Sequence, residues 1–202
     1  MTTTPWVLFD YGGVLCTDQP DGDRAAIASA AGIAAGQLDD FWSEYWRLRP
    51  ALDRADLDMA GYWAAVLHRA PSRSEVERLT DLDHASWLHP RAATLAIVAE
   101  LTRRGSQVAL LSNAPVTFAD ILDGQPWIQV IPHRFYSGRL GVIKPDPQAY
   151  GTVLDALGAS PEQATFVDDR QENVTGAATV GLRGVLYRSP SELAAALDLL
   201  AA

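Results

Sequence analysis

The chain has 202 residues, of which 48% are hydrophobic and 20% are charged, a composition typical of a soluble globular protein with a sizeable core. The formal net charge of −9 argues against a nucleic-acid-binding surface and against a surface for anionic membranes, because either would need a basic patch. A small anionic substrate is still compatible with this charge, since a few local cations or a metal ion can reverse the field inside one pocket.

The sequence gives no sign of export or of membrane insertion. Residues 1–5 carry no basic side chain and no long apolar run follows them, so we expect no signal peptide. Nowhere do about 18 consecutive apolar residues occur, which excludes an ordinary transmembrane helix. The single cysteine, Cys16, cannot form an internal disulfide bond and suits a reducing compartment. We therefore expect a cytoplasmic protein.

The first predicted element is a buried strand at Val7-Leu8-Phe9, which runs directly into Asp10. A short, continuous apolar run is typical of a strand in a parallel sheet. Asp10 would then lie at the carboxyl end of the strand, the edge where open α/β sheets bind ligands. Gly12 and Gly13 allow a sharp turn that brings backbone amides close to a bound anion. Taken alone, this stretch fits a strand that ends in a surface turn equally well.

The next part of the chain, up to Leu88, shows helical periods and no convincing strand. Apolar residues at steps of three and four predict two helix faces, formed by Leu38, Phe41, Trp42, Tyr45 and Trp46 and by Tyr62, Trp63, Val66 and Leu67. Ser72 and Glu75 form a capping box that opens a further helix towards Trp87. We expect most of these aromatic residues to form the core of a small helical bundle, although one or two could line a substrate pocket.

From Pro90 onwards, helices and strands alternate. The predicted helices cover 90–104, 118–122, 147–157, 160–163 and 172–180, and a last helix follows Ser189. The predicted strands cover 107–111, 165–167 and 183–187. The stretch 127–143 is ambiguous, and we predict short strands joined by a turn at Ser137-Gly138.

This alternation predicts an α/β fold with a three-layer, Rossmann-like parallel sheet core. The helical block follows the first strand, so it can lie over the carboxyl edge of the sheet. We predict a core domain formed by residues 1–16 and 89–202, and a small all-helical cap formed by residues 17–88.

Polar residues follow three predicted strands at what should be one edge of the sheet. They are Asp10, Ser112 with Asn113, and Asp168 with Asp169, and Lys144 precedes a helix on the same side. Carboxylate oxygens are the ligands that Mg²⁺ prefers, and a carboxylate can also act as a nucleophile. A lysine and a hydroxyl can hold the oxygens of a transferred phosphoryl group. The sequence therefore predicts a site for phosphate and a divalent metal ion.

Four motifs in this order resemble those of the haloacid dehalogenase-like (HAD) hydrolases. They are Phe9-Asp10-x-Gly-Gly-Val-Leu15, Leu110-Leu-Ser112-Asn113, Lys144-Pro-Asp-Pro-x-x-Tyr150 and Phe166-Val-Asp168-Asp169-x-x-x-Asn173. Each motif alone is modestly specific, but the ordered set extends over the whole chain. The helical block also resembles the cap that this family carries between its first two motifs.

The resemblance implies a Mg²⁺-dependent phosphatase that acts on a small phosphorylated metabolite through an aspartyl-phosphate intermediate. It implies that Asp10 is both the nucleophile and a metal ligand. The carbonyl of Gly12 and the carboxylate of Asp169 would be further metal ligands.

The remaining motif residues would hold the phosphate or support the site. By resemblance, Ser112 and the amide of Asn113 bind phosphate, and Lys144 pairs with both phosphate and the nucleophile. Asp168 would act through water or orient the site, and Asn173 would support it from behind.

Gly12 departs from the pattern of many phosphatases in this family. These enzymes have a second Asp two positions after the nucleophile, which serves as general acid and base. Such assistance is typically worth ~10²–10⁴ in rate, so its loss should matter unless another group replaces it. Asp18 and water are the candidate substitutes. A metal bound through the Gly12 carbonyl would not be affected.

Two alternatives stay open. The first is a metal-free 2-haloacid dehalogenase, although such enzymes typically carry neutral residues in the fourth motif, where this chain has Asp168 and Asp169. The second is a binding or regulatory protein that kept the fold and lost turnover. The sequence leaves open whether the protein is a monomer or a homodimer. It also leaves open which cap residues contact the substrate, the candidates being Trp42, Trp46, Arg47, Arg49 and Trp63.

Overall fold

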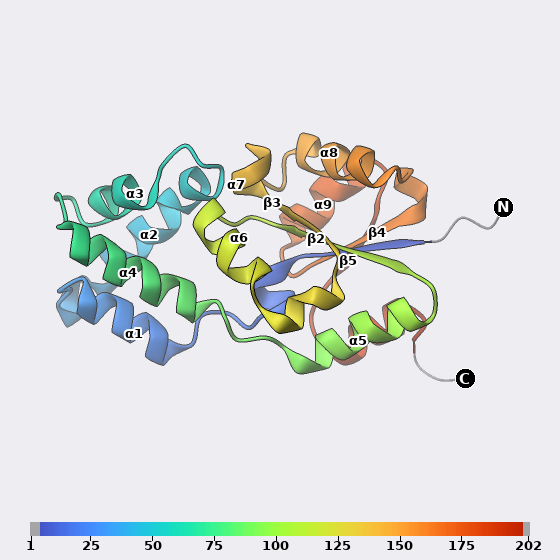
Figure 1. The fold of residues 1–202 in the computed structure, drawn as a ribbon, viewed down its shortest axis with the longest axis horizontal. Helices are drawn as coiled ribbons and strands as arrows, with labels where there is room; N and C mark the ends of the chain where they lie inside the picture. The colour runs from blue at the N-terminus through green and yellow to red at the C-terminus, as the bar shows by residue number, and fades with distance from the viewer. Residues whose placement is uncertain (1–4, 200–202) are drawn as a thin grey trace.

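The computed structural model describes residues 5–199 and contains one five-stranded parallel sheet. The first four and last three residues of the predicted core domain lie outside the described residues. The strand order is β3-β2-β1-β4-β5, so the first strand is central (Figure 1). The strands are β1 (Trp6–Phe9), β2 (Gln107–Ser112), β3 (His133–Tyr136), β4 (Ala164–Asp168) and β5 (Arg183–Leu186).

The register of the sheet brings the polar strand ends to one level. Phe9 is paired with Leu110 of β2 on one side and with Val167 of β4 on the other. Because parallel strands advance together, Asp10 lies level with the end of β2 and with Asp168. The expected convergence at one sheet edge is therefore present.

Helices cover both faces of the sheet, as the α/β prediction requires. Side chains alternate along a strand, so Val7 and Phe9 pack on one face and Trp6 and Leu8 on the other. The first face is covered by α5 (Ala92–Arg103), α6 (Val116–Asp123) and α10 (Pro190–Ala196). The second face is covered by α8 (Pro147–Leu157) and α9 (Gln171–Thr179), seen above the sheet in Figure 1.

Four helices form a separate helical unit, residues 21–86, at one end of the sheet (Figure 1). They are α1 (Asp21–Ala30), α2 (Leu38–Asp53), α3 (Met59–Val66) and α4 (Arg73–Ser86). The unit has its own hydrophobic cluster, in which Tyr45, Tyr62 and Trp63 are fully buried. The predicted aromatic core is confirmed.

Two neighbouring segments connect the helical unit to the sheet. The Thr17 N–H donates to the His89 carbonyl at 3.0 Å, and the Arg91 N–H donates to the Leu15 carbonyl at 2.7 Å. These bonds hold the outgoing and returning chain side by side. The helical unit is therefore fixed over the carboxyl edge of the sheet by a short paired hinge.

Short helical turns complete the fold, and one of them replaces a predicted strand. They are η1 (Tyr11–Leu15), η2 (Ala35–Gln37), η3 (Pro126–Val130), η4 (Pro161–Gln163) and the four-residue helix α7 (Ser137–Leu140). The prediction of short strands joined at Ser137-Gly138 was wrong, because only β3 forms and a helix starts at Ser137. The Gly138 N–H donates to the Ala114 carbonyl at 3.1 Å, and this tertiary contact turns the chain.

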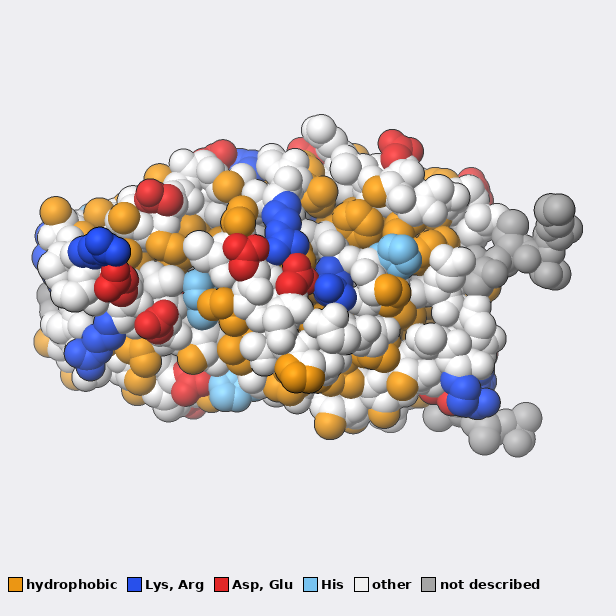
Figure 2. Space-filling view, in the orientation of Figure 1, with side chains coloured by type: hydrophobic (Ala, Val, Ile, Leu, Met, Phe, Trp, Pro, Cys, Tyr) orange, Lys and Arg blue, Asp and Glu red, His pale blue; other side chains and the backbone are white. Residues whose placement is uncertain are grey.

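The surface carries charges of both signs. On the face shown in Figure 2, acidic and basic side chains are interspersed among apolar ones. Among the described residues, we find no helix with the length and apolar character needed to cross a membrane.

Candidate active site

Three carboxylates meet at the carboxyl edge of the sheet. Asp10 follows β1 directly, Asp168 is the last residue of β4, and Asp169 comes next. One oxygen from each lies within 4.8 Å of the others. Such a set has the oxygen chemistry that Mg²⁺ prefers, and it would repel itself without cations.

Lys144 supplies one cation to this cluster. It is 3% exposed, and its Nζ lies 2.6 Å from Asp10 Oδ1 and 2.8 Å from Asp168 Oδ2. Burial acts to lower the pKa of Lys144, but Asp10 and Asp168 outweigh burial and raise it. Asn113 fixes the lysine backbone, since its side chain accepts from the Lys144 N–H at 2.8 Å and donates to the Lys144 carbonyl at 2.9 Å.

The two oxygens of Asp10 have different surroundings. Oδ1 pairs with Lys144 and accepts from the Tyr11 N–H at 2.6 Å, whereas Oδ2 forms no hydrogen bond within residues 5–199. Burial and the carboxylate of Asp168 raise the pKa of Asp10 well above its usual range, and Lys144 opposes them. The side chain is thus anchored through Oδ1, while Oδ2 has no hydrogen bond among the described residues.

Asp168 is fully buried and satisfied by the protein. Besides Lys144, it accepts from the Arg170 N–H at 2.8 Å and from the Asn173 side-chain amide at 3.0 Å on each oxygen. The Tyr150 hydroxyl donates to the Asn173 carbonyl at 2.7 Å and holds that residue in turn. These contacts orient Lys144 rather than face a ligand.

The glycine turn is shaped around Asp169. Gly13 has φ = +72°, and a Cβ at this position would overlap the Asp169 carboxyl group. Only glycine allows the backbone this conformation and this approach without strain. Burial, followed by the charge of Asp168, raises the pKa of Asp169. The turn, Asp10 and Asp169 together fit a divalent cation bound at this edge.

Trp87 occupies the space beside Gly12. A Cβ at Gly12 would lie 3.4 Å from the Trp87 ring, in ordinary van der Waals contact with the indole. Asp18, the suggested substitute acid, is exposed, lines the same cavity and has no hydrogen-bond partner among the residues described.

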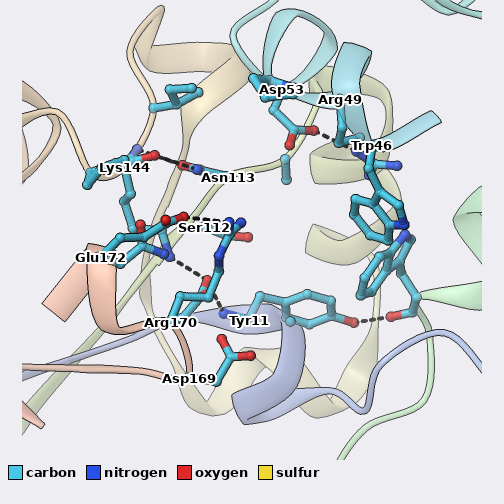
Figure 3. A pocket seen from close by; sticks show the side chains of 18 of the residues that line it. Tyr11, Trp46, Arg49, Asp53, Ser112, Asn113, Lys144, Asp169, Arg170 and Glu172 are labelled. Carbon is cyan, nitrogen blue, oxygen red and sulfur yellow. Dashed lines mark hydrogen bonds and ion pairs between the residues drawn. The ribbon is translucent and has the colours of Figure 1, made fainter. Parts of the chain in front are cut away.

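A cavity of about 570 Å³ separates the sheet edge from the helical unit. Figure 3 looks into it, with Trp46, Arg49 and Asp53 coming from α2 and Ser112, Lys144 and Asp169 from the sheet side. Its volume is that of a small-molecule site. Acidic side chains outnumber basic ones by five to three in its lining, so a phosphate dianion would need an added cation there.

The structure places most of the predicted site residues in this cavity. Its lining includes Asp10, Gly12, Ser112, Asn113, Lys144, Asp169 and Asn173, while Asp168 lies behind it. Among the candidate cap contacts, Trp46 and Arg49 line the cavity, whereas Trp42, Arg47 and Trp63 are not part of its lining. Asp53 and Trp87 also line the cavity and were not predicted from the sequence. The four-residue spacing of Arg49 and Asp53 on a helix was the available signal for Asp53.

Comparison with known proteins gives similarities of two kinds, the first in sequence. A family model for a hydrolase, haloacid dehalogenase-like hydrolase, matches residues 4–181. Phosphoserine phosphatase from Thermus thermophilus is 38% identical over 172 residues, which are 77% of this chain and 66% of that protein. The chain thus spans just under two thirds of the length of this relative.

The second kind of similarity is structural. A HAD family enzyme from Bacteroides thetaiotaomicron, solved as a mutant with magnesium and inorganic phosphate, superposes with a TM-score of 0.72 at 16% identity. The match covers 92% of this chain and 95% of that one. L-2-haloacid dehalogenase from Xanthobacter autotrophicus gives a TM-score of 0.69 at 21% identity, covering 98% and 84%. At these identities the two likenesses establish a common fold.

Proposed function

Because the chain belongs to the haloacid dehalogenase-like hydrolase family, we propose that it is a Mg²⁺-dependent phosphatase for a small phosphorylated metabolite. One observation carries the proposal, namely the uncompensated negative charge beside Asp10. Lys144 compensates part of the charge of Asp10 and Asp168, but Asp169 forms no ion pair within the described residues. Without a metal ion, this third carboxylate would have no counter-ion and would repel the carboxylates of Asp10 and Asp168.

In the proposed reaction, Asp10 is the nucleophile. Its Oδ2 attacks phosphorus, the bond between phosphorus and the ester oxygen breaks, and the leaving oxygen takes up a proton. A water molecule then attacks phosphorus and loses a proton, the bond between phosphorus and Asp10 Oδ2 breaks, and inorganic phosphate leaves with the Asp10 carboxylate restored. Both steps place negative charge on the phosphoryl oxygens, which the Lys144 ammonium, the Ser112 hydroxyl and the Asn113 N–H would hold.

Asp10, Asp169 and the Gly12 carbonyl would hold the Mg²⁺ ion, whose charge would offset that of phosphate. Burial and the charge of Asp168 raise the pKa of Asp10, and the positive charge of a bound Mg²⁺ ion would lower it again and favour the ionised nucleophile. The proton for the leaving group would come from Asp18, which lines the cavity, or from water, because Gly12 has no side chain to supply it.

We also propose that residues 17–88 act as a cap on a core formed by residues 1–16 and 89–202. The helical unit contributes one wall of the cavity, so it would exclude water and choose the substrate.

Phosphate release from p-nitrophenyl phosphate, measured with Mg²⁺ and with EDTA, tests the proposal. We expect metal-dependent release that Asp10→Asn lowers by about 10⁴-fold or more, because the nucleophile is lost. Asp120→Asn is the matched control, since Asp120 is an exposed residue of α6 paired with Arg139. Chloride release from 2-chloropropionate with EDTA present would instead indicate a dehalogenase. Mg²⁺ binding without turnover of any phosphate ester would indicate a binding protein.

A further inference from the structure

The helical unit presents its own ion pair to the cavity. Arg49 and Asp53 lie one turn apart near the end of α2, and Arg49 Nε donates to Asp53 Oδ1 at 2.9 Å. Each residue is only 7% exposed, yet both line the cavity that contains Asp10 and Lys144. A buried pair is costly to desolvate, so its position facing a ligand cavity calls for an explanation.

The free atoms of this pair are one donor and one acceptor. Arg49 Nη1 donates to the Tyr45 hydroxyl at 2.7 Å and to Asp83 Oδ2 at 3.2 Å. Arg49 Nη2 and Asp53 Oδ2 have no hydrogen-bond partner within residues 5–199, and neither atom is fully enclosed by protein. Because both residues line the cavity, these two atoms are available to a ligand there (Figure 3).

The charge of the cluster limits what can bind to it. Arg49 already lies between the carboxylates of Asp53 and Asp83, so a lone ligand carboxylate would be the third on one guanidinium. A lone ammonium would satisfy Asp53 but would leave the Nη2 donor of Arg49 unpaired, which costs about 1–3 kcal/mol when it is desolvated. A group with both a carboxylate and an ammonium satisfies both atoms and adds no net charge.

We propose that Arg49 and Asp53 bind a zwitterionic leaving group, so that the substrate is a phosphate monoester of a small hydroxy amino acid. Arg49 Nη2 would donate to the carboxylate, and Asp53 Oδ2 would accept from the ammonium. This inference rests on the proposed phosphatase function and names the substrate class of the same site.

The pair is also held at a fixed position relative to the phosphate-binding loop. The Ser137 hydroxyl donates to the Asp53 carbonyl at 2.6 Å and accepts from the Ala114 N–H at 2.9 Å. Ala114 directly follows Ser112 and Asn113, which would hold the phosphate. This bridge fixes the separation between the groups that would hold the two ends of the substrate.

A panel of four phosphate esters tests the proposal through kcat/KM. O-Phosphoserine carries both charged groups, phosphoglycolate lacks the ammonium, phosphoethanolamine lacks the carboxylate, and glycerol phosphate lacks both. We expect phosphoserine to exceed each of the others by about tenfold or more. Asp53→Asn should abolish the preference over phosphoglycolate, and Arg49→Gln the preference over phosphoethanolamine. Arg47→Gln, on the same helix and exposed, is the control that should keep both preferences.

Binding measured by calorimetry with Asp10→Asn separates this inference from the proposed function. A Kd for phosphoserine at least about tenfold below those of phosphoglycolate and phosphoethanolamine supports the zwitterion site, whether or not the wild-type protein turns over. Equal Kd values, or a preference for glycerol phosphate, would overturn it even if p-nitrophenyl phosphate is hydrolysed. Absence of all hydrolysis together with selective binding would overturn the phosphatase proposal alone.

Discussion

Two buried cations face the same cavity from different parts of the molecule, and each lies between two carboxylates. In the sheet, Lys144 lies between Asp10 and Asp168, at 2.6 and 2.8 Å. In the helical unit, Arg49 contacts Asp53 at 2.9 Å and Asp83 at 3.2 Å. Each arrangement thus places one positive charge between two negative charges, but the chemistry of the two clusters differs.

The two clusters differ in the groups that surround each cation. Lysine is a compact charge, and its cluster has a further carboxylate, Asp169, close by. Arginine is a planar fork, and Tyr45 and Gln19 add neutral hydrogen bonds around the second cluster. The sheet cluster therefore still attracts a cation, whereas the helical cluster is nearly satisfied and presents one directed donor and one acceptor. The first suits reaction and the second suits recognition.

Removal of the arginine should give the largest effect on stability. In Arg49→Met, two buried carboxylates lose their cation, which should lower the free energy of unfolding by about 3–5 kcal/mol at pH 7. Burial already raises the pKa of Asp53 against the effect of Arg49, so the variant should raise it further. Between the unfolded and the raised folded pKa, the folded state binds more protons, and stability falls as pH rises.

Urea denaturation at pH 5, 6, 7 and 8 measures this effect. The loss of unfolding free energy in Arg49→Met should be largest at pH 8 and smaller at pH 5, where Asp53 takes up a proton. Arg49→Lys retains the positive charge, so it should lose less stability than Arg49→Met at every pH. A deficit that does not change with pH would mean that lost packing, not charge, accounts for the loss.

Removal of the lysine should act mainly on activity. Lys144→Met should lower kcat/KM by about 10²–10³-fold for every phosphate ester, since Lys144 would hold the phosphoryl group and not the leaving group. Steady-state rates with phosphoserine and p-nitrophenyl phosphate provide the measurement. The comparison between the clusters fails if Lys144→Met changes the preference among esters as strongly as Arg49→Gln does.

The sheet cluster was predictable from sequence for a geometric reason. Parallel strands end at one edge, so polar residues at the carboxyl ends of β1, β2 and β4 had to converge there, and Asp10, Ser112 and Asp168 do. The ordered motifs added Lys144, which precedes a helix rather than following a strand. The catalytic and ligand-binding roles of these residues, and the domain limits, are still predictions.

The helical cluster was predictable only in part, because the contact between Arg49 and Asp83 depends on packing between helices. Asp83 lies 34 residues beyond Arg49 and meets it only because α4 packs within the same unit as α2. Apolar periodicity identified the buried face of α2, but it carries no information about charged residues within that face. The error at Ser137 has a similar cause, since its contact with Ala114 is tertiary.

A third cluster, formed by residues of α6, β3 and α7, inverts the arrangement and gives the smallest expected effect. Here one carboxylate, Asp123, lies among cations: Arg134 at 2.6 Å and Arg139 at 2.7 Å, with the Tyr136 hydroxyl also at 2.7 Å. Burial acts to raise the pKa of Asp123, but the hydrogen bonds from Tyr136, Arg139 and Arg134 outweigh burial and lower it. The pKa of Asp123 is therefore shifted in the opposite direction to that of Asp53.

Asp123→Asn should cost about 1–2 kcal/mol at pH 7, because its side chain is 26% exposed and solvent screens the pairs. A lowered folded pKa means that this contribution is complete above the unfolded carboxyl pKa and is lost as pH falls through the folded value. The difference between wild type and variant should thus stay constant from pH 8 to pH 5 and shrink only below that. Within the same pH range, the loss of unfolding free energy caused by Arg49→Met should change with pH, whereas the loss caused by Asp123→Asn should stay constant. Parallel pH curves for the two variants would show that the direction of charge compensation does not distinguish these clusters.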